Sequence, residues 1–292
     1  MSDAPPVVSD ATPHADAPEL HRELLDAARA AAAAAVDLIH TRRPASFRID
    51  DKSSATDHVT EMDVASERLI RSVLAARRPH DRIEGEEGQS DAAPPVAPGD
   101  ESPVTWWVDP IDGTTNYVYD HPGYNVSIAA QIEGRTVAAV VADPTHGRTY
   151  SATLGGGSYC DDRRLRLAPA DRSAQDLLAT ALVATGFSYS SERRARQAAV
   201  LAELLPRIRD LRRMGAAALD LCSVGAGRVD AYYEFGLGRW DLAAGQLVAT
   251  EAGAVVEPIR GGPDLPGSVL AARPELVGPL QELLERLGAG QV

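Results

Sequence analysis

Cysteine and aromatic residues are both scarce in this 292-residue chain. The cysteines are Cys160 and Cys222, without CxxC spacing, and aromatic residues make up 5% of the sequence. Two cysteines cannot build a disulfide framework, so we interpret them as small buried apolar side chains and expect a reducing, cytoplasmic setting. With few aromatic rings and abundant alanine, small residues must fill much of the core.

Positive charge and long hydrophobic runs are also lacking. The formal net charge is −13 and no lengthy Lys/Arg run occurs, which argues against nucleic acid as a primary ligand. The apolar run AAAAAVDLI is too short to span a bilayer, and the first residues lack the basic segment of a signal peptide. We therefore expect no membrane contact, and a disordered tail over residues 1–15.

Apolar periodicity predicts a layered α/β or α+β protein. We expect a helix from Asp16 to about His40, a second helix over 64–77 and a strand over 82–84, followed by a surface loop over 88–103. Strand-like runs from Val104 onward predict an antiparallel meander. The later elements are expected to alternate: a helix at 193–205, a strand at 209–213, a helix at 217–224, a strand at 229–235, a helix at 241–252, strands at 254–256 and 268–271, and a closing helix. We expect one domain over 16–292, with parts 16–185 and 186–292.

The segment from Trp106 to Asn116 is the most informative one for chemistry. An apolar strand ends in Asp109, Pro110, Ile111 and Asp112, and Pro110 stiffens the turn so that both carboxylates and the Ile111 carbonyl converge. Hard oxygen donors without nearby Cys or His pairs favour Mg²⁺, with Mn²⁺ as the alternative. The competing interpretation is a simple turn, since Asp, Pro and Gly are common turn formers.

Two further features accompany this segment. Gly113 allows close approach of an anion, and a helix opening at Thr114 would present free N–H groups to a phosphate. Asp241 lies at a predicted helix start, where a plain N-cap role is equally consistent with the sequence.

The segments WVDPIDGTTNY and WDLAAGQLVATEAGA resemble the two signature motifs of the inositol monophosphatase family, in the same order and roughly 130 residues apart. The resemblance continues through stretches beginning at Lys52, Val59, Gly85, Arg213 and Ala231. It implies the layered α-β-α-β-α sandwich of the inositol monophosphatase and fructose-1,6-bisphosphatase type. Lys52 resembles a residue of the family's mobile loop.

The resemblance also implies roles for individual residues. Two or three Mg²⁺ ions would be held by Glu86, Asp109, the Ile111 carbonyl, Asp112 and Asp241. Asp63 and Thr114 would orient and deprotonate a water and act with Glu86 as the catalytic residues, although Asp63 is also a suitable first-turn helix carboxylate. The substrate would contact Gly113, Thr114, Gly215, Ala216, Ala217, Glu234 and Asp241. Ala216 departs from the family, which often has Ser or Thr there.

The activity implied is hydrolysis of a small-molecule phosphate monoester, with inositol monophosphate as the leading substrate. Histidinol phosphate, fructose 1,6-bisphosphate and NADP phosphatases share the motifs and remain alternatives, and a non-catalytic binding module is a further one. The family resemblance also implies a homodimer and sensitivity to lithium. Arg239 is a candidate for the pocket rim, although a solvated arginine is the simpler interpretation.

Overall fold

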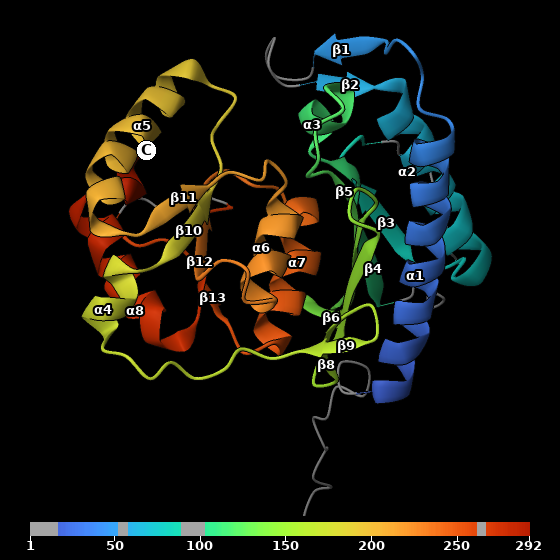
Figure 1. Cartoon of the computed structure of the whole chain (residues 1–292). Helices are drawn as coiled ribbons and strands as arrows, with labels where there is room; N and C mark the ends of the chain where they lie inside the picture. Colours follow the sequence, from blue (N-terminus) through green and yellow to red (C-terminus); the bar gives the residue numbers. More distant parts are fainter. Residues whose placement is uncertain (1–16, 52–57, 89–102, 262–266) are drawn as a thin grey trace, which may run out of the picture.

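The computed structural model describes residues 17–51, 58–88, 103–261 and 267–292 (Figure 1). The predicted tail, Lys52 and nearly all of the predicted loop over 88–103 lie outside these ranges. The elements that build the N-terminal sheet and its helices are α1 (Pro18–Thr41), β1 (Ile49–Asp51), β2 (His58–Thr60), α2 (Glu61–Arg77), β3 (Arg82–Gly85), β4 (Val104–Asp112), α3 (Thr114–Val118), β5 (Asn125–Ile132), β6 (Arg135–Asp143), β7 (Arg148–Thr153), β8 (Gly157–Cys160) and β9 (Arg163–Leu165).

The remaining elements build the C-terminal sheet and the helices beside it. They are α4 (Ala174–Ala179), β10 (Leu182–Thr185), α5 (Ser191–Leu204), β11 (Asp210–Arg212), α6 (Ala217–Gly225), β12 (Ala231–Glu234), α7 (Arg239–Glu251), β13 (Val255–Glu257), β14 (Val269–Ala272) and α8 (Pro274–Arg286), with short 3₁₀ turns at Leu205–Arg207 and Ala289–Gln291. Strand β10 belongs to this sheet, although it falls within the part 16–185 assigned to the first half.

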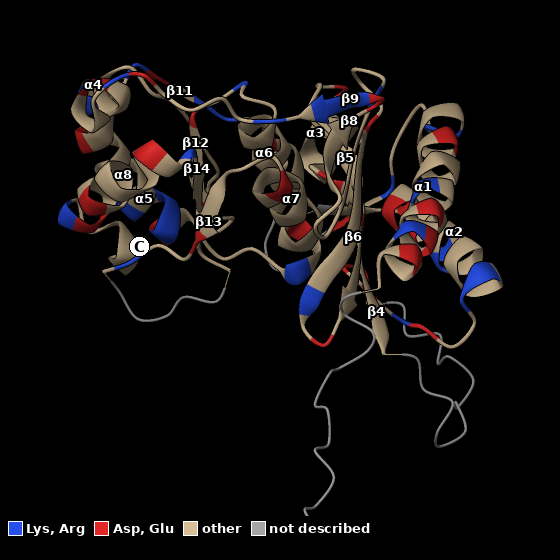
Figure 2. Ribbon diagram, turned by 90° about the horizontal axis from the view of Figure 1, so that it is seen from below, with Lys and Arg blue, Asp and Glu red and all other residues tan. Residues whose placement is uncertain are grey.

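The elements stack in five layers, as Figure 2 shows from below. The first sheet has the order β3-β4-β5-β6-β7-β8-β9, with β3 parallel to β4 and every later pair antiparallel, which confirms the predicted meander. The second sheet has the mixed order β11-β10-β12-β14-β13. Helices α1 and α2 pack on one sheet, α4, α5 and α8 on the other, and α6 and α7 lie between the two. The layered α/β prediction is therefore confirmed.

Helix α1 buries an alanine-rich stripe. Leu24, Ala28, Ala31, Ala35 and Ile39 are each at most 1% exposed and pack on the first sheet. The helix begins at Pro18 after an N-cap at Ala17 that makes no side-chain hydrogen bond, so it starts slightly later than predicted. In the described ranges no helix is both long enough and apolar enough to cross a membrane.

Small residues allow α6 and α7 to approach each other closely between the sheets. A Cβ atom added at Gly245 would lie 2.7 Å from the Leu221 Cβ, and one added at Gly225 would lie 3.1 Å from the Ala249 Cα. Cys160 and Cys222 are buried free thiols, and burial raises the pKa of both. Small side chains therefore pack this central layer, as the composition predicts.

Candidate active site

Strand β4 carries two carboxylates, Asp109 and Asp112, near its C-terminal end. It extends through Asp112, and its register with β5 shifts between Asp109 and Asp112, so the DPID segment is an irregular strand end. The Ile111 N–H donates to Asp109 Oδ1 at 3.0 Å. Asp112 Oδ2 accepts from Asn125 Nδ2 at 2.8 Å and from the Ala218 N–H at 2.9 Å. Both carboxylates are thus held in place by fixed donors.

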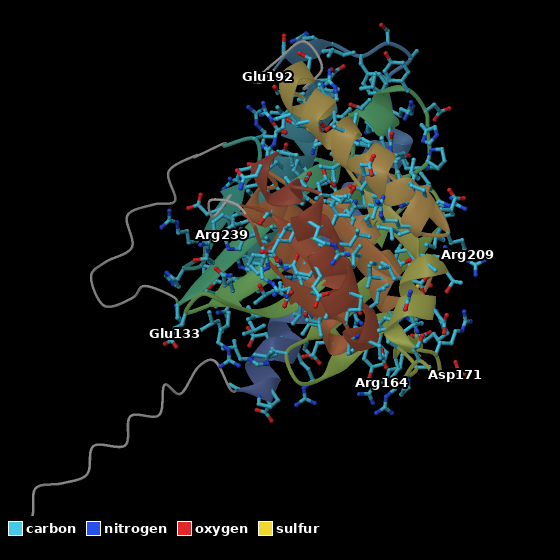
Figure 3. The ribbon with its side chains drawn as sticks, turned by 90° about the vertical axis from the view of Figure 1, so that its left-hand side faces the viewer. Glu133, Arg164, Asp171, Glu192, Arg209 and Arg239 are labelled. Atoms are coloured by element: carbon cyan, nitrogen blue, oxygen red, sulfur yellow. The ribbon has the colours of Figure 1, made fainter. Side chains whose placement is uncertain are left out.

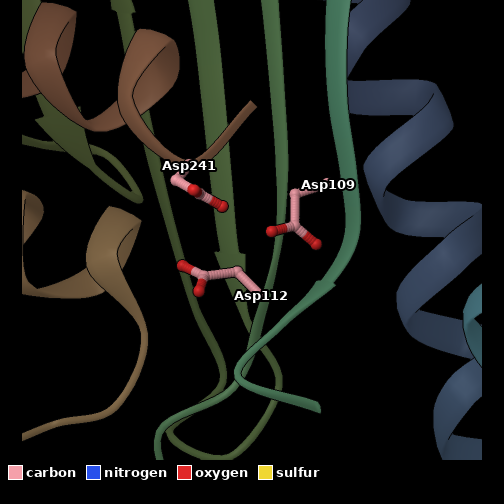
Figure 4. Close-up of side chains that lie close together, drawn as sticks. All are labelled: Asp109, Asp112 and Asp241. Atoms are coloured by element: carbon pink, nitrogen blue, oxygen red, sulfur yellow. The ribbon is translucent and has the colours of Figure 1, made fainter. Parts of the chain in front are cut away.

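Helix α7 brings the third carboxylate to the same point. Asp109, Asp112 and Asp241 offer oxygen atoms that all lie within 4.8 Å of one another, and Figure 4 shows the three side chains converging. The helix begins at Arg239 after an N-cap at Gly238, and the Gly238 N–H donates to Asp241 Oδ2 at 2.6 Å. Asp241 is therefore the third helical residue and not the N-cap.

The three carboxylates are costly to bury together. Burial, together with a smaller repulsion from Glu86, raises the pKa of Asp112 to about 6 despite the opposing hydrogen bonds from Asn125 and Ala218. Burial, followed by repulsion from Asp112 and Glu86, raises the pKa of Asp241 well above its usual value. A cation would relieve both costs, and an all-oxygen donor set matches the preference of Mg²⁺. The residues present therefore fit a hard divalent cation.

Glu86 lies in the turn after β3 and lines the same cavity, but it is outside the group of three converging carboxylates. Its N–H donates to the Val108 carbonyl at 3.1 Å, which sets the turn beside β4. The buried Glu67 supports this turn, because its two carboxylate oxygens accept from the Glu87 N–H and from Arg71 Nε. Glu67 could have been found from its position in the sequence, because a charged residue there falls on the buried face of α2 with Ile70 and Leu74.

Asp63 and Thr114 meet as the family resemblance implies. Thr114 Oγ1 donates to Asp63 Oδ1 at 3.0 Å and lies 3.1 Å from the Ile111 carbonyl oxygen. The other Asp63 oxygen accepts from the Thr60 N–H at 2.8 Å and the Thr60 hydroxyl at 2.6 Å. Helix α2 consequently begins at Glu61, three residues before the predicted start. Asp63 is thus both a first-turn capping residue and the partner of Thr114.

A cavity of about 490 Å³ opens beside these groups. It is lined by Glu86, Asp109, Ile111, Asp112, Gly113, Thr114, Gly215, Ala216, Ala217, Glu234 and Asp241 together with residues of the C-terminal half. All the metal and substrate candidates named from the sequence border it, while Asp63 touches it through Thr114. A larger cavity of about 710 Å³ lies between α1 and β7, but none of these candidates lines it.

Close backbone contacts join the two sides of this cavity. Gly113 has φ +90°, and a Cβ there would lie 2.7 Å from the Gly123 carbonyl oxygen, so a side chain is excluded. Asn116 Nδ2 donates to the Gly123 and Met214 carbonyl oxygens at 2.7 and 2.8 Å. The Gly113 turn and the segment that contains Gly215 are thereby clamped together.

Glu234 lies at the end of β12 in a buried polar cluster. Tyr232 donates its hydroxyl to Glu234 Oε2 at 2.6 Å. Burial raises the pKa of Glu234 to about 7, against the lowering effects of Tyr232 and Arg213. Asp220, which the sequence analysis did not single out, is 2% exposed, and burial followed by repulsion from Glu234 raises its pKa well above normal.

Arg239 and Arg193 have different positions relative to the cavity. Arg239 does not line the cavity; its guanidinium lies 5.4 Å from the Trp107 ring centroid. Figure 3 shows Arg239 well separated from Glu192 at the start of α5. Arg193, beside Glu192 in the chain, does line the cavity, and no motif in the sequence drew attention to it.

Comparisons with known proteins agree with this geometry. A family model described as the inositol monophosphatase family matches residues 20–290. The inositol-1-monophosphatase SuhB of Mycobacterium tuberculosis is 50% identical over 238 residues, covering 80% of each chain. A relative from Pasteurella multocida named Nus factor SuhB is 40% identical over 238 residues, covering 80% of this chain and 84% of its own.

A solved structure of Mycobacterium tuberculosis SuhB superposes with a TM-score of 0.74 at 42% identity. The superposition covers 93% of this chain and 98% of the other. The layered fold, the converging carboxylates and both signature segments thus occur in one chain whose residues 20–290 match the family model. The protein belongs to the inositol monophosphatase family.

Proposed function

We propose that this protein hydrolyses small-molecule phosphate monoesters with Mg²⁺, and that myo-inositol 1-phosphate is its leading substrate. The observation that carries the proposal is the convergence of Asp109, Asp112 and Asp241 within 4.8 Å beside the Thr114–Asp63 hydrogen bond. Its mycobacterial relatives at 49–50% identity carry the name inositol-1-monophosphatase.

Five oxygen donors would hold two or three cations: Glu86, Asp109, the Ile111 carbonyl, Asp112 and Asp241. Bound there, Mg²⁺ would polarise the phosphoryl group and acidify a water. Thr114 Oγ1 lies 3.0 Å from Asp63 Oδ1 and Thr114 lines the cavity, so the hydroxyl can donate its proton to that carboxylate and accept one from the cavity side. Thr114 can accept a proton from an attacking water while its own proton passes to Asp63, whose second oxygen is held by Thr60.

Residues of the cavity wall support a proposal for how the rest of the substrate is bound. We propose that the Gly113 and Thr114 N–H groups bind the phosphate. Gly215, Ala216, Ala217 and Glu234 would contact the hydroxyls of the polyol, with Asp241 shared between metal and substrate. Ala216 is buried and offers no hydroxyl, so Glu234 would carry most of the recognition of the polyol.

The test is phosphate release from myo-inositol 1-phosphate, histidinol phosphate, fructose 1,6-bisphosphate and NADP, with Mg²⁺ and with a chelator. We expect metal-dependent turnover led by inositol phosphate, and a loss of at least about 10³-fold in Asp112→Asn. Asp26→Asn is the matched control, because Asp26 is an exposed residue of α1. Another leading ester would change the substrate but not the chemistry. Folded protein inactive on every ester would contradict the proposal and favour a binding role.

Several finer properties rest on family resemblance and are proposed with it. We infer one phosphatase domain over 16–292, a homodimer, Mg²⁺ in preference to Mn²⁺, inhibition by lithium and a cytoplasmic location. Light scattering coupled to gel filtration tests the dimer, and a monomer at micromolar concentration would contradict it. Activity titrations with Mg²⁺, Mn²⁺ and Li⁺ test the cation properties.

A further inference from the structure

Arg193 presents an uncompensated charge to the active-site cavity. It lies in the first turn of α5 and lines the cavity together with Glu234 and Gly236. Its Nε and Nη2 atoms are buried and have no hydrogen-bond partner among the described residues. A Cβ at Gly236 would lie 2.8 Å from Arg193 Nη1, so the absence of a side chain there makes room for the guanidinium.

No acidic side chain in the described ranges pairs with this guanidinium. Glu192 bonds instead to Arg196 at 2.8 Å. Glu234 shares the cavity, but the cation that lowers its pKa is Arg213. An arginine keeps its charge at any physiological pH, and a buried unpaired donor costs free energy. A charge retained at that cost indicates a partner that arrives with the substrate.

The backbone around Arg193 is held in place. The Arg193 N–H donates to Ser190 Oγ, and the Ser190 N–H donates to Ser188 Oγ at 3.1 Å. Ser188 is bonded further to Gln197 and to Arg194, whose Nη1 donates to the Ser188 carbonyl oxygen at 2.9 Å. The guanidinium therefore starts from an ordered loop and helix end, which suits a specific binding contact.

The cavity is lined by charges of both signs that come from different elements. Glu86, Asp109, Asp112 and Asp241 line it where the scissile phosphate would meet the cations, and α5 contributes Arg193 from the C-terminal half. We propose that Arg193 is a specificity-determining residue that binds a second anionic group of the substrate, a phosphate or a carboxylate. The inference rests on the proposed phosphatase function and extends its substrate class to esters that carry a second anionic group.

Three hexose-derived esters of similar size show whether the second anionic group that Arg193 binds is a phosphate or a carboxylate. Glucose 6-phosphate has one anionic group, 6-phosphogluconate adds a carboxylate, and fructose 1,6-bisphosphate adds a second phosphate. The variants are Arg193→Ala, Arg193→Lys and the control Arg196→Ala, which removes the same charge from an exposed position on the same helix. Melting temperatures establish that each variant is folded.

We expect the wild-type protein to prefer at least one two-anion ester over glucose 6-phosphate. Arg193→Ala should lower kcat/KM on that ester by about tenfold or more, mainly through KM, because a remote contact contributes equally to ground and transition states. Glucose 6-phosphate should change less than about twofold, and Arg193→Lys should fall between, since lysine lacks the planar fork. Equal losses on one-anion and two-anion esters, or no wild-type preference, would overturn the proposal.

A binding measurement separates this inference from the phosphatase assignment. Calorimetric titration with fructose 1,6-bisphosphate and Mg²⁺ compares the dissociation constants of the wild type and the three variants, with turnover monitored in parallel. If no ester is hydrolysed, a tenfold higher dissociation constant for the bisphosphate in Arg193→Ala, but not in Arg196→Ala, still supports the second anion subsite. If esters are hydrolysed but all four proteins bind the bisphosphate equally, the subsite is wrong and the phosphatase function stands.

Discussion

The two sheets contribute different kinds of residue to the cavity. The seven-stranded sheet and its helices supply Glu86, Asp109, Asp112 and the Thr114–Asp63 pair, all suited to binding cations or moving a proton. The five-stranded sheet and its helices supply Glu234, Arg193 and the Gly215 segment, which form the wall around the substrate. Asp241 is the exception, a metal candidate that comes from the helical layer between the sheets.

The contacts that join the halves explain how this exception arises. Ser127 on β5 donates its hydroxyl to the Trp240 carbonyl oxygen at 3.0 Å, which fixes the start of α7 on the first sheet. The start of α6 is fixed in the same way by the bond from the Ala218 N–H to Asp112. The helices of the middle layer are therefore bonded directly to the first sheet, which places Asp241 beside Asp109 and Asp112.

The largest expected effect on turnover comes from replacing Asp241, the metal candidate that lies between the sheets. Asp241→Asn should reduce turnover by about 10³-fold or more, because a neutral amide is a weaker cation ligand than a carboxylate. Asp210→Asn, an exposed position in the same half, should leave turnover unchanged. Phosphate release and Mg²⁺ titration measure both. Near-normal turnover in Asp241→Asn would place the cation chemistry entirely in the first half.

A smaller loss is expected when the proton path is cut within the first half. Thr114→Val keeps the shape of the side chain but removes the donor to Asp63, and we expect turnover to fall by about 10²-fold or more. Thr114→Ser should recover most of the rate because it restores a hydroxyl. Mg²⁺ affinity from calorimetry should be similar in all three proteins. A loss of rate that follows a loss of Mg²⁺ affinity would instead assign Thr114 to the metal site.

The sequence predicts the metal candidates of the first half better than the recognition residues of the second, for a physical reason. The DPID segment places two carboxylates and a stiff proline within four residues, so their convergence is a local property. Arg193 gives no such local signal, because its importance depends on Gly236 and the cavity wall, more than 40 residues away. The apolar pattern also does not predict the short strands β1, β9 and β10, because three or four residues are too few to show alternation.

The recognition half can be tested through the pH dependence of Glu234. The hydrogen bond from Tyr232 lowers the pKa of Glu234, which burial raises to about 7, so Tyr232→Phe should move this pKa upward. If ionised Glu234 accepts substrate hydroxyls, KM for inositol phosphate should rise about fivefold at pH 7 and recover toward pH 8.5. A generic ester such as phenyl phosphate should show no such change. An unshifted profile would remove Glu234 from substrate recognition.

The smallest expected effect is on the thermal stability of the metal-free protein. It tests the first half without a measurement of turnover. Burial raises the folded-state pKa of Asp112 from 3.8 to about 6, so the metal-free protein should lose stability as pH rises through this interval. In chelator at pH 7.5, Asp112→Asn should therefore melt roughly 2–6 °C above the wild type, and the difference should shrink toward pH 5 as the native carboxyl becomes protonated. Added Mg²⁺ should raise the wild-type melting temperature more than that of the variant, because the cation neutralises the buried Asp112 carboxylate, which the variant lacks. The opposite result, a wild type more stable than the variant in chelator at pH 7.5, would contradict this prediction. It would mean that the hydrogen bonds from Asn125 and Ala218 alone compensate the buried charge of Asp112, with no need for a cation.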